Sequence, residues 1–341
     1  GGSVFMMRIT RTPCRISFFG GGTDYPEWFR EHGGTVLAGA INRYCYCTVR
    51  DLPAHLFQYK YRVTYSTVES VQDLQHVRHR AVRAVLEYLQ IDRPLSISYD
   101  GELPARSGIG SSSAFVVGLL KCFTPEVSAD VVASAATYIE REVLHEPVGW
   151  QDQVITAHGG VNLLRFKRDV VERMPIIGDC IAELERHLLL VYTGPRALTM
   201  PTVWTELNER RGDLLAQIKQ MAESGVRLLQ QEEMVRFGQL LGDSWSVKKA
   251  LDPYISNSIV DTVYEEALRA GALGGKLLGS GGGGFMALFV QPEKHDAVRE
   301  RLRTMPIINV RFDTTGSTEV VLTVPEQTQS TSKLEPLPPT V

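Results

Sequence analysis

The stretch LPARSGIGSSSAFVVGLL, which runs from Leu103 to Leu120, places glycines and serines directly before an apolar run. The glycines let the backbone turn without the steric penalty of a Cβ atom, and the apolar run then begins a helix. Amides at the start of a helix lack partners within it, and the helix dipole favours negative charge there. The stretch therefore predicts a polyphosphate site formed by Ser107, Gly108, Ile109, Gly110, Ser111, Ser112 and Ser113. An N-capped helix after a tight turn is the purely structural alternative.

Two well-known motifs do not fit this stretch. The pattern G-x-x-x-x-G-K-[ST] is absent, and Ser112 lacks the flanking glycines of a G-x-S-x-G nucleophile elbow. Another glycine-rich stretch, KLLGSGGGGFMALFV, matches G-x-G-x-x-G. A strand follows that match, however, where a dinucleotide-binding fold needs a helix. Its glycines indicate either close approach of the backbone to a ligand or a structural hairpin.

The first of the three glycine-rich stretches along the chain is RTPCRISFFGGGTDYPEWF, so that LPARSGIGSSSAFVVGLL is the second and KLLGSGGGGFMALFV the third. An apolar strand runs into three glycines and then presents Thr23, Asp24 and Tyr25. One interpretation of Asp24 is a cap of the turn before Pro26, because aspartate side chains commonly bond to the backbone of such turns. A ligand-binding loop is the other interpretation.

Composition excludes several classes of function. The 341 residues are 43% hydrophobic and 22% charged, which predicts a globular protein too large for a single core. A formal charge of -3 gives no electrostatic signature of nucleic-acid or anionic-membrane binding. The five cysteines form no C-x-x-C pair, and they indicate reduced core thiols in a cytoplasmic protein. The eight histidines show no zinc-ligand spacing.

Periodicity predicts the organisation of the chain. The early region is rich in strands, including RISFFG, TVLAGAINRYCYCTVR and LSISYD, and amphipathic helices are expected over residues 71–90 and 128–144. A strongly helical region follows from about residue 199 to 269, and strands then return. We predict an N-terminal domain over residues 6–185, a C-terminal domain over 186–326 and a disordered tail over 327–341.

Taken together, the three glycine-rich stretches resemble the GHMP kinase superfamily, the small-molecule kinases of galactose, homoserine, mevalonate and phosphomevalonate. The motifs are TPCRISFFGGGTDYPEW, PARSGIGSSSAF and KLLGSGGGGFMALF, and the resemblance covers most of residues 8–324. The segments GGGTDY, IEREVLHEPVGWQDQ and GGVNLLRF look most like the sugar-1-kinase branch, typified by D-glycero-D-manno-heptose 7-phosphate kinase. The resemblance implies an α+β fold of two domains with the active site in the cleft between them.

The resemblance also implies roles for individual residues. Asp152 matches the catalytic aspartate, which accepts or orients the proton of the attacking hydroxyl, and Arg15 is the cation beside it. Ser112 and Glu140 match the ligands of Mg²⁺, with Glu142 as the alternative carboxylate. Asp24 matches a sugar-binding carboxylate. The substrate-binding set comprises Gly20, Gly21, Gly22, Thr23, Asp24, Arg196, Gly281, Gly282 and Gly283, in which Arg196 neutralises a substrate phosphate.

The reaction implied by the resemblance uses ATP and Mg²⁺ and phosphorylates the anomeric C1 hydroxyl of a heptose 7-phosphate. Three alternatives stay open on the sequence. The acceptor could be another sugar, as in a fucokinase or galactokinase, although Gly-Gly-Gly replaces the Gly-Glu-His of galactokinases. The chemistry could be ATP-dependent decarboxylation, against which GGGTDY argues. A non-catalytic sugar sensor should lack the base or the metal ligands, and all three of these residues are present.

Overall fold

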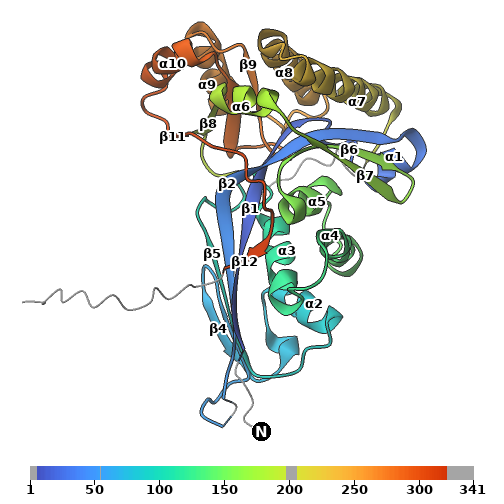
Figure 1. Ribbon diagram of the computed structural model, residues 1–341, viewed down its shortest axis with the longest axis vertical. Coiled ribbons are helices and arrows are strands. Elements are labelled where there is room, and N and C mark those ends of the chain that lie inside the picture. Colours follow the sequence, from blue (N-terminus) through green and yellow to red (C-terminus); the bar gives the residue numbers. More distant parts are fainter. Residues whose placement is uncertain (1–5, 54, 197–205, 321–341) are drawn as a thin grey trace, which may run out of the picture.

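A computed structural model describes residues 6–53, 55–196 and 206–320. The molecule is elongated, and two sheets with their own helices lie one above the other along its long axis (Figure 1). The larger sheet contains eight strands and the smaller contains four. Mixed helices and sheets in two parts agree with the predicted α+β class.

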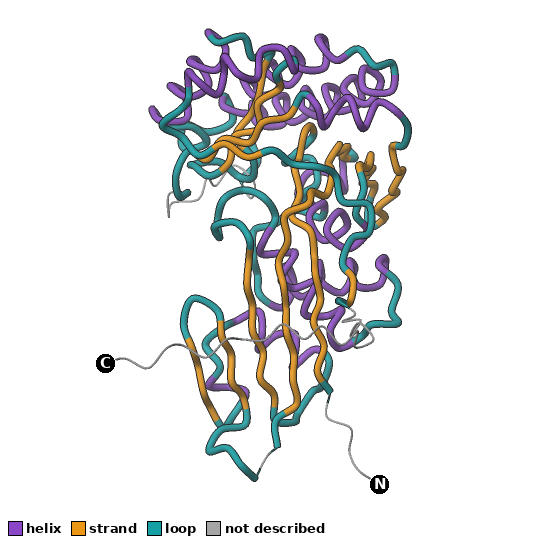
Figure 2. Tube along the Cα trace, turned by 60° about the vertical axis from the view of Figure 1, so that its left-hand side comes forward, coloured by secondary structure: helices purple, strands orange, loops and turns teal. Residues whose placement is uncertain are grey.

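Two long strands from the start of the chain form the centre of the larger sheet (Figure 2). They pair in antiparallel register from Met7 opposite Arg50 to Phe19 opposite Leu37, which confirms both as the predicted strands. The sheet order is β12-β1-β2-β5-β3-β4, and β6 pairs with both β2 and β7. The strands are β1 (Met7–Phe19), β2 (Gly34–Asp51), β3 (Tyr61–Thr64), β4 (Val68–Val71), β5 (Leu95–Gly101), β6 (Val161–Lys167), β7 (Val170–Ile176) and β12 (Thr318–Glu319).

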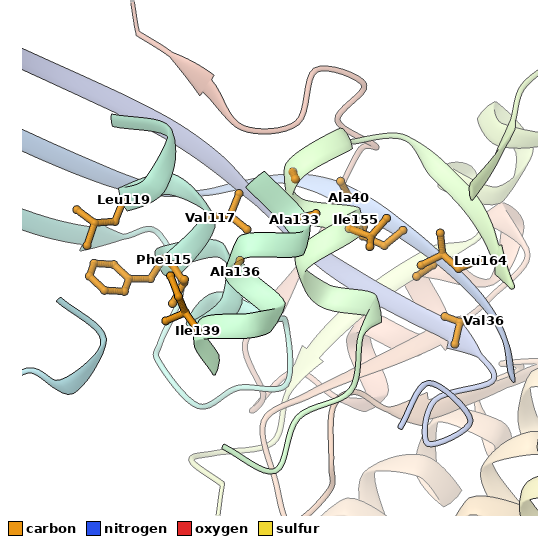
Figure 3. Close-up of a cluster of buried hydrophobic side chains, with 14 of the residues drawn as sticks. Val36, Ala40, Phe115, Val117, Leu119, Ala133, Ala136, Ile139, Ile155 and Leu164 are labelled. Carbon is orange, nitrogen blue, oxygen red and sulfur yellow. The ribbon is translucent and has the colours of Figure 1, made fainter. Parts of the chain in front are cut away.

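Helices cover one face of this sheet and form its core (Figure 1). Apolar side chains from three of them meet side chains of β2 and β6, as the close-up of the buried cluster shows (Figure 3). Full burial of one large side chain in such a core stabilises the fold by about 1.5–3 kcal/mol. The elements are α1 (Pro26–His32), η1 (Leu74–His76), α2 (Arg80–Tyr88), α3 (Ser111–Phe123), α4 (Ala129–Tyr138), η2 (Ile139–Val143) and α5 (Gln151–His158).

The helix expected over residues 71–90 is shorter than its periodicity predicts. Val71 ends strand β4, and α2 begins only at Arg80. The reason is the buried carboxylate of Glu69, which accepts hydrogen bonds from the backbone amides of Arg78 at 2.7 Å and His79 at 3.0 Å. Those amides are thereby held outside a helix, and the side chain of His79 then caps α2.

The smaller sheet has the order β11-β8-β10-β9 and packs against helices that lie between its strands β8 and β9 in the sequence. The predicted helical region is confirmed as three long helices. Trp245 and Phe237, both on α8, are fully buried in its core. The strands are β8 (Leu188–Tyr192), β9 (Gly274–Leu277), β10 (Phe285–Phe289) and β11 (Ile307–Ile308), and the helices are α6 (Asp179–Arg186), α7 (Glu209–Gln230), α8 (Met234–Lys249), α9 (Ser258–Arg269), η4 (Pro292–Lys294) and α10 (His295–Arg301).

Several contacts join the halves of the molecule, and two of them lie at the end of β1 and where the chain returns to the larger sheet. At the end of β1, the ring centroids of Phe18 and Phe19 lie 6.1 and 5.3 Å from that of Phe237. After the smaller sheet, the chain returns to the larger one, where the amide of Asp313 donates to the carbonyl of Ala40 at 2.8 Å. The predicted domain boundary at residues 185/186 stays a prediction, and the predicted tail at 327–341 lies outside the described residues.

All five cysteines are buried and free, as their surroundings predict. Within residues 6–53, 55–196 and 206–320, none of the helices combines the length and the apolar character that crossing a membrane requires.

Candidate active site

A cavity of about 540 Å³ lies where the three glycine-rich stretches converge. One wall comes from the larger sheet and its helices, through the end of β1, the loop after it, the start of α3 and the start of α5. The other wall comes from the helices and strands of the smaller sheet. The lining includes Arg15, Ser17, Gly21, Gly22, Asp24, Arg106, Gly108, Gly110, Ser111, Ser112, Ser113, Gln151, Asp152, Arg196, Lys248, Lys276, Gly279 and Ser280.

Backbone hydrogen bonds fasten the three stretches to one another. The amide of Arg15 donates to the carbonyl of Ile109 at 2.9 Å, which joins the first stretch to the second. The amide of Phe285 donates to the carbonyl of Ser107 at 2.9 Å, which joins the third stretch to the second. A Cβ atom on Gly108 would lie 2.3 Å from the backbone of the third stretch, so this contact requires glycine.

Arg15 and Asp152 form the central ion pair of the cavity. The guanidinium donates to both carboxylate oxygens, from Nε at 2.6 Å and from Nη2 at 3.1 Å. It also donates to the carbonyl of Gly108 at 2.6 Å. A bidentate arginine contact fixes both the position and the plane of a carboxylate. Asp152 is thus held with its orientation defined, beside the loop before α3.

The loop before α3 passes directly over this ion pair. Gly110 has a left-handed φ of 72° and is the N-cap of the helix, so no side chain caps its first turn. A Cβ atom there would lie 3.0 Å from Cγ of Arg15 and 3.3 Å from Oδ2 of Asp152. The first-turn amides and the hydroxyls of Ser111 and Ser112 therefore face the cavity next to the paired carboxylate.

Asp24 also lines the cavity and is almost completely buried. Its carboxylate accepts from the amides of Gly22 at 3.0 Å and Gln151 at 3.2 Å. Burial raises the pKa of Asp24, and the negative charge of Asp152 raises it further. The carboxylate of Asp152 is therefore close enough to influence that of Asp24.

Two other residues of the first loop have structural contacts. The Thr23 hydroxyl donates to the carbonyls of Gly20 at 2.7 Å and Thr35 at 3.1 Å. A Cβ atom on Gly20 would lie only 1.8 Å from the carbonyl oxygen of Thr35. Neither residue is among those that line the cavity. Their assignment to the substrate-binding set stays a prediction.

Glu140 is buried under the start of α3, while Glu142 is exposed. Oε2 of Glu140 accepts from Oγ of Ser113 at 3.0 Å and from the side chain of Gln153 at 2.6 Å. Its other oxygen has no hydrogen-bond partner among the described residues. Burial raises the pKa of Glu140 to about 8. The structure thus pairs this carboxylate with Ser113, whereas Ser112 is exposed on the cavity side of the helix.

The glycines of the third stretch pack mainly against protein backbone. The amide of Gly282 donates to the carbonyl of Ile255 at 2.9 Å, and Gly281 approaches the same residue. Gly283 lies against the segment Pro195–Arg196. None of these three glycines is among the residues that line the cavity, whereas Gly279 and Ser280 are. Their predicted contact with substrate stays a prediction, and their observed contacts are those of a structural turn.

Arg196 does line the cavity, and its Nη1 donates to Oγ of Ser280 at 2.6 Å. Its buried Nε has no hydrogen-bond partner within the described part of the chain. Burial and the neighbouring guanidinium of Arg106 lower the pKa of Arg196. Two arginines therefore face the same cavity from the two halves of the molecule, which suits an anionic ligand.

Sequence reasoning missed several residues of the cavity, including Ser17, Gln151 and the two lysines Lys248 and Lys276. Ser17 and Gln151 were unassigned although they flank motif residues. Lys276 opens the third glycine-rich stretch, so its position was a usable signal. No sequence signal marked Lys248, because it belongs to an ordinary helical pattern.

Comparison with known proteins agrees with this arrangement. Residues 76–160 match the family described as GHMP kinases N terminal domain, and residues 226–307 match GHMP kinases C terminal. The D-glycero-alpha-D-manno-heptose 7-phosphate kinase of Campylobacter jejuni is 31% identical over 318 residues, which cover 86% of this chain and 92% of that protein. The bifunctional fucokinase/GDP-fucose pyrophosphorylase of Arabidopsis thaliana is 28% identical over 88% of this chain and 32% of its own length.

A solved structure shows the same fold. The crystal structure of a D-glycero-D-manno-heptose 1-phosphate kinase from Bacteroides thetaiotaomicron superposes with a TM-score of 0.77, covers 94% of this chain and all of that one, and is 23% identical. The three glycine-rich stretches meet at one cavity in a fold shared with such kinases, and a full-length relative exceeds 30% identity. The chain belongs to the GHMP kinase family, and within it the chain is an ATP-dependent sugar kinase.

Proposed function

We propose that this kinase transfers the γ-phosphoryl group of ATP to the C1 hydroxyl of D-glycero-D-manno-heptose 7-phosphate in the cytoplasm, giving the 1,7-bisphosphate used for nucleotide-activated heptose. The observation that carries the proposal is the position of Asp152. Its carboxylate is fixed by Arg15 between the loop before α3 and the loop that holds Asp24. An acceptor hydroxyl and a nucleotide phosphate could meet at that point.

ATP would place its phosphates against the loop that includes Gly108 and Gly110 and against the first turn of α3. The glycine N-cap leaves the first-turn amides without a side-chain cap, and their dipole favours the polyphosphate. The hydroxyls of Ser111 and Ser112 face the same space. Residues Ser107 and Ile109 would contribute by holding the loop against the neighbouring stretches.

Asp152 would accept the proton of the attacking hydroxyl or orient that hydroxyl towards the γ-phosphorus. Phosphoryl transfer requires little covalent work from a protein, and positioning with charge stabilisation provides most of the acceleration. Arg15 would hold the carboxylate in place and partly neutralise the phosphoryl oxygens. Asp24, which also lines the cavity, would accept hydrogen bonds from sugar hydroxyls, with Gly21 and Gly22 leaving room for the ring.

The residues present fit a Mg²⁺ ion that relies mainly on the nucleotide. Among the residues placed by the structure, no three His, Cys, Asp or Glu side chains form a cluster, whereas Mg²⁺ commonly combines one or two protein oxygens with phosphates and water. Ser112 lines the cavity and would contribute its hydroxyl. Glu140 is buried and is not among the lining residues, and its unpartnered oxygen would become a ligand on losing its proton. Bound there, Mg²⁺ would neutralise charge on the phosphate oxygens.

A direct experiment identifies the acceptor sugar. The protein is incubated with ATP, Mg²⁺ and a panel containing heptose 7-phosphate, the unphosphorylated heptose, fucose and galactose, and the product is identified by mass and phosphorus NMR. We expect a heptose 1,7-bisphosphate. The similarity to a plant fucokinase makes fucose the second candidate. Preference for fucose or galactose would overturn the heptose proposal.

A further inference from the structure

Two buried lysines on the smaller-sheet wall of the cavity lack a role in the reaction as described above. Lys248 and Lys276 are 6% and 4% exposed, and both line the cavity. Among the residues placed by the structure, neither forms an ion pair with a carboxylate. Their hydrogen bonds go to backbone carbonyls alone, from Lys276 to Phe18 at 3.3 Å and from Lys248 to Leu277 at 3.1 Å and to Gly279.

Both lysines line the cavity and keep N–H donors that no described residue accepts. An ammonium group carries three N–H donors and accepts nothing. Lys276 uses one of its donors in the bonds given above, and Lys248 uses two. A charge removed from water without a partner is strongly disfavoured, so the unused donors favour an anionic ligand.

Lys248, Lys276 and Arg15 lie close together in the cavity, and the repulsion between their charged forms strengthens the preference for an anionic ligand. Burial and, after it, the charge of Arg15 lower the pKa of Lys276 to about 7. Burial likewise lowers the pKa of Lys248, to which Lys276 and Arg15 also contribute. The nearby carboxylate of Asp24 offsets only part of this effect at Lys276. The guanidinium of Arg15 and two lysines whose charged forms are disfavoured thus lie near one another, and a bound anion would favour the protonated form of both lysines.

Packing between α8 and β9 places the two lysines at the cavity. Helix α8 lies directly on β9, where a Cβ atom on Gly274 would come within 2.1 Å of the carbonyl oxygen of Gly238. This close approach brings the last turn of α8, with Lys248, to the end of β9 and the glycine-rich turn after it. Lys249, the next residue, points elsewhere and pairs with Asp261 at 3.5 Å.

We propose that Lys248 and Lys276 form a phosphate-binding subsite on the smaller-sheet wall of the cavity. The inference rests on the proposed function, because that reaction brings two candidate phosphate groups into the cavity besides the nucleotide's α- and β-phosphates. One is the γ-phosphoryl group of ATP, and the other is the remote phosphate of the acceptor. Both present the same tetrahedral array of anionic oxygens, which compact ammonium groups bind as point charges.

The test compares Lys248→Met and Lys276→Met with the matched control Lys249→Met. Methionine has nearly the length of lysine without its charge, so a buried site keeps its volume. Calorimetry measures the binding of heptose 7-phosphate, unphosphorylated heptose, ADP and a non-hydrolysable ATP analogue to each protein. We expect at least a tenfold loss of affinity for one phosphate-bearing ligand in both cavity variants and no loss in the control.

The ligand that loses affinity identifies the phosphate. A loss for heptose 7-phosphate but not for unphosphorylated heptose assigns the subsite to the acceptor. A loss for the ATP analogue but not for ADP assigns it to the γ-phosphoryl group. Unchanged affinity for all four ligands in two folded variants overturns the subsite.

A second measurement uses the unaltered protein and does not depend on the folding of a variant. Reductive methylation followed by mass spectrometry compares lysine labelling with and without inorganic phosphate or the ligands above. Slower labelling of Lys248 and Lys276, with Lys249 unaffected, supports the subsite, and equal labelling of all three contradicts it. If the acceptor panel shows no reaction with heptose 7-phosphate, the proposed function fails, while protection by inorganic phosphate or the ATP analogue still decides the subsite.

Discussion

At the scale of single residues, Asp152 carries the proposed chemistry, because Arg15 fixes its carboxylate where the nucleotide loop and the acceptor loop meet. Asp152→Asn should lower kcat at least about a hundredfold, the usual scale for loss of a general base, while ATP affinity stays near that of the parent. Steady-state kinetics and calorimetry measure the two. Asp169→Asn, at an exposed ion pair with Arg30, is the control. Near-normal turnover would remove Asp152 from the mechanism.

Glu140 provides a pH-dependent prediction for the metal-free protein. Burial raises its pKa from 4.5 to about 8, so the folded state keeps a proton that the unfolded chain releases. This contribution to stability is fully present below about pH 4.5 and is lost as the pH rises through about 8. In Glu140→Gln, the free energy of unfolding should therefore decline less between pH 5 and 9, by roughly a few kcal/mol.

Chemical denaturation across that pH range measures the effect. The exposed Glu142 on the same turn supplies the control, since Glu142→Gln should follow the parent protein. Parallel pH profiles for the parent and Glu140→Gln would show that the carboxyl group is ionised in the folded state.

A substitution of Arg196 tests whether this residue binds the remote phosphate of the acceptor. Its guanidinium faces the cavity with one buried donor unpartnered within the described residues, and Ser280 holds it in place. If it binds the remote phosphate equally in the ground and transition states, Arg196→Ala should raise KM for the sugar phosphate at least about tenfold with little change in kcat. The unphosphorylated sugar is the internal control. An equal loss on both acceptors, or on neither, would exclude the phosphate role.

At the scale of elements, the loop before α3 and the helix it starts form one unit. Gly110 is left-handed, and an added methyl group would approach the Arg15–Asp152 pair within 3.0–3.3 Å. Gly110→Ala should therefore weaken ATP binding roughly tenfold and lower kcat, because the loop must move away from the pair. Calorimetry and kinetics measure the two effects.

A matched control separates this effect from backbone strain. Gly178 is also left-handed, with a φ of 113°, but it lies before α6 with open space around it. Gly178→Ala should lower stability by about 1–2 kcal/mol through strain alone and leave ATP affinity unchanged. If both variants bound ATP as the parent does, the loop before α3 would be a structural turn only.

At the scale of the whole molecule, Phe237 joins the halves of the fold. It is fully buried on α8 and contacts Phe18 and Phe19 at the end of β1, and Phe289 on β10. Phe237→Ala should lower the free energy of unfolding by about 3–5 kcal/mol, as expected for loss of a buried aromatic ring. Equilibrium denaturation measures the loss. A change below about 1 kcal/mol would show that the ring is not essential to the packing between the halves.

Local patterns determined much of this protein from the sequence alone. The apolar run of β1, the alternation in β2, the apolar run of α3 and the helical periodicity of α7 to α9 each depend on neighbouring residues, and all were predicted. The same holds for the loop before α3, because its glycines and serines are adjacent in the chain. Asp24 and Asp152 were identified through motif resemblance, and both line the cavity.

Tertiary structure decided what depends on distant residues. Helix α2 begins late because a buried carboxylate from another segment binds its preceding amides. Glu140 is buried and Glu142 exposed because Glu140 packs against the start of α3, where the side chains of Ser113 and Gln153 donate to its carboxylate. Lys248 and Lys276 share a wall only because α8 packs on β9, a contact that no local pattern records. Sequence periodicity therefore specified the elements, whereas close packing between them selected the charged groups that face the cavity.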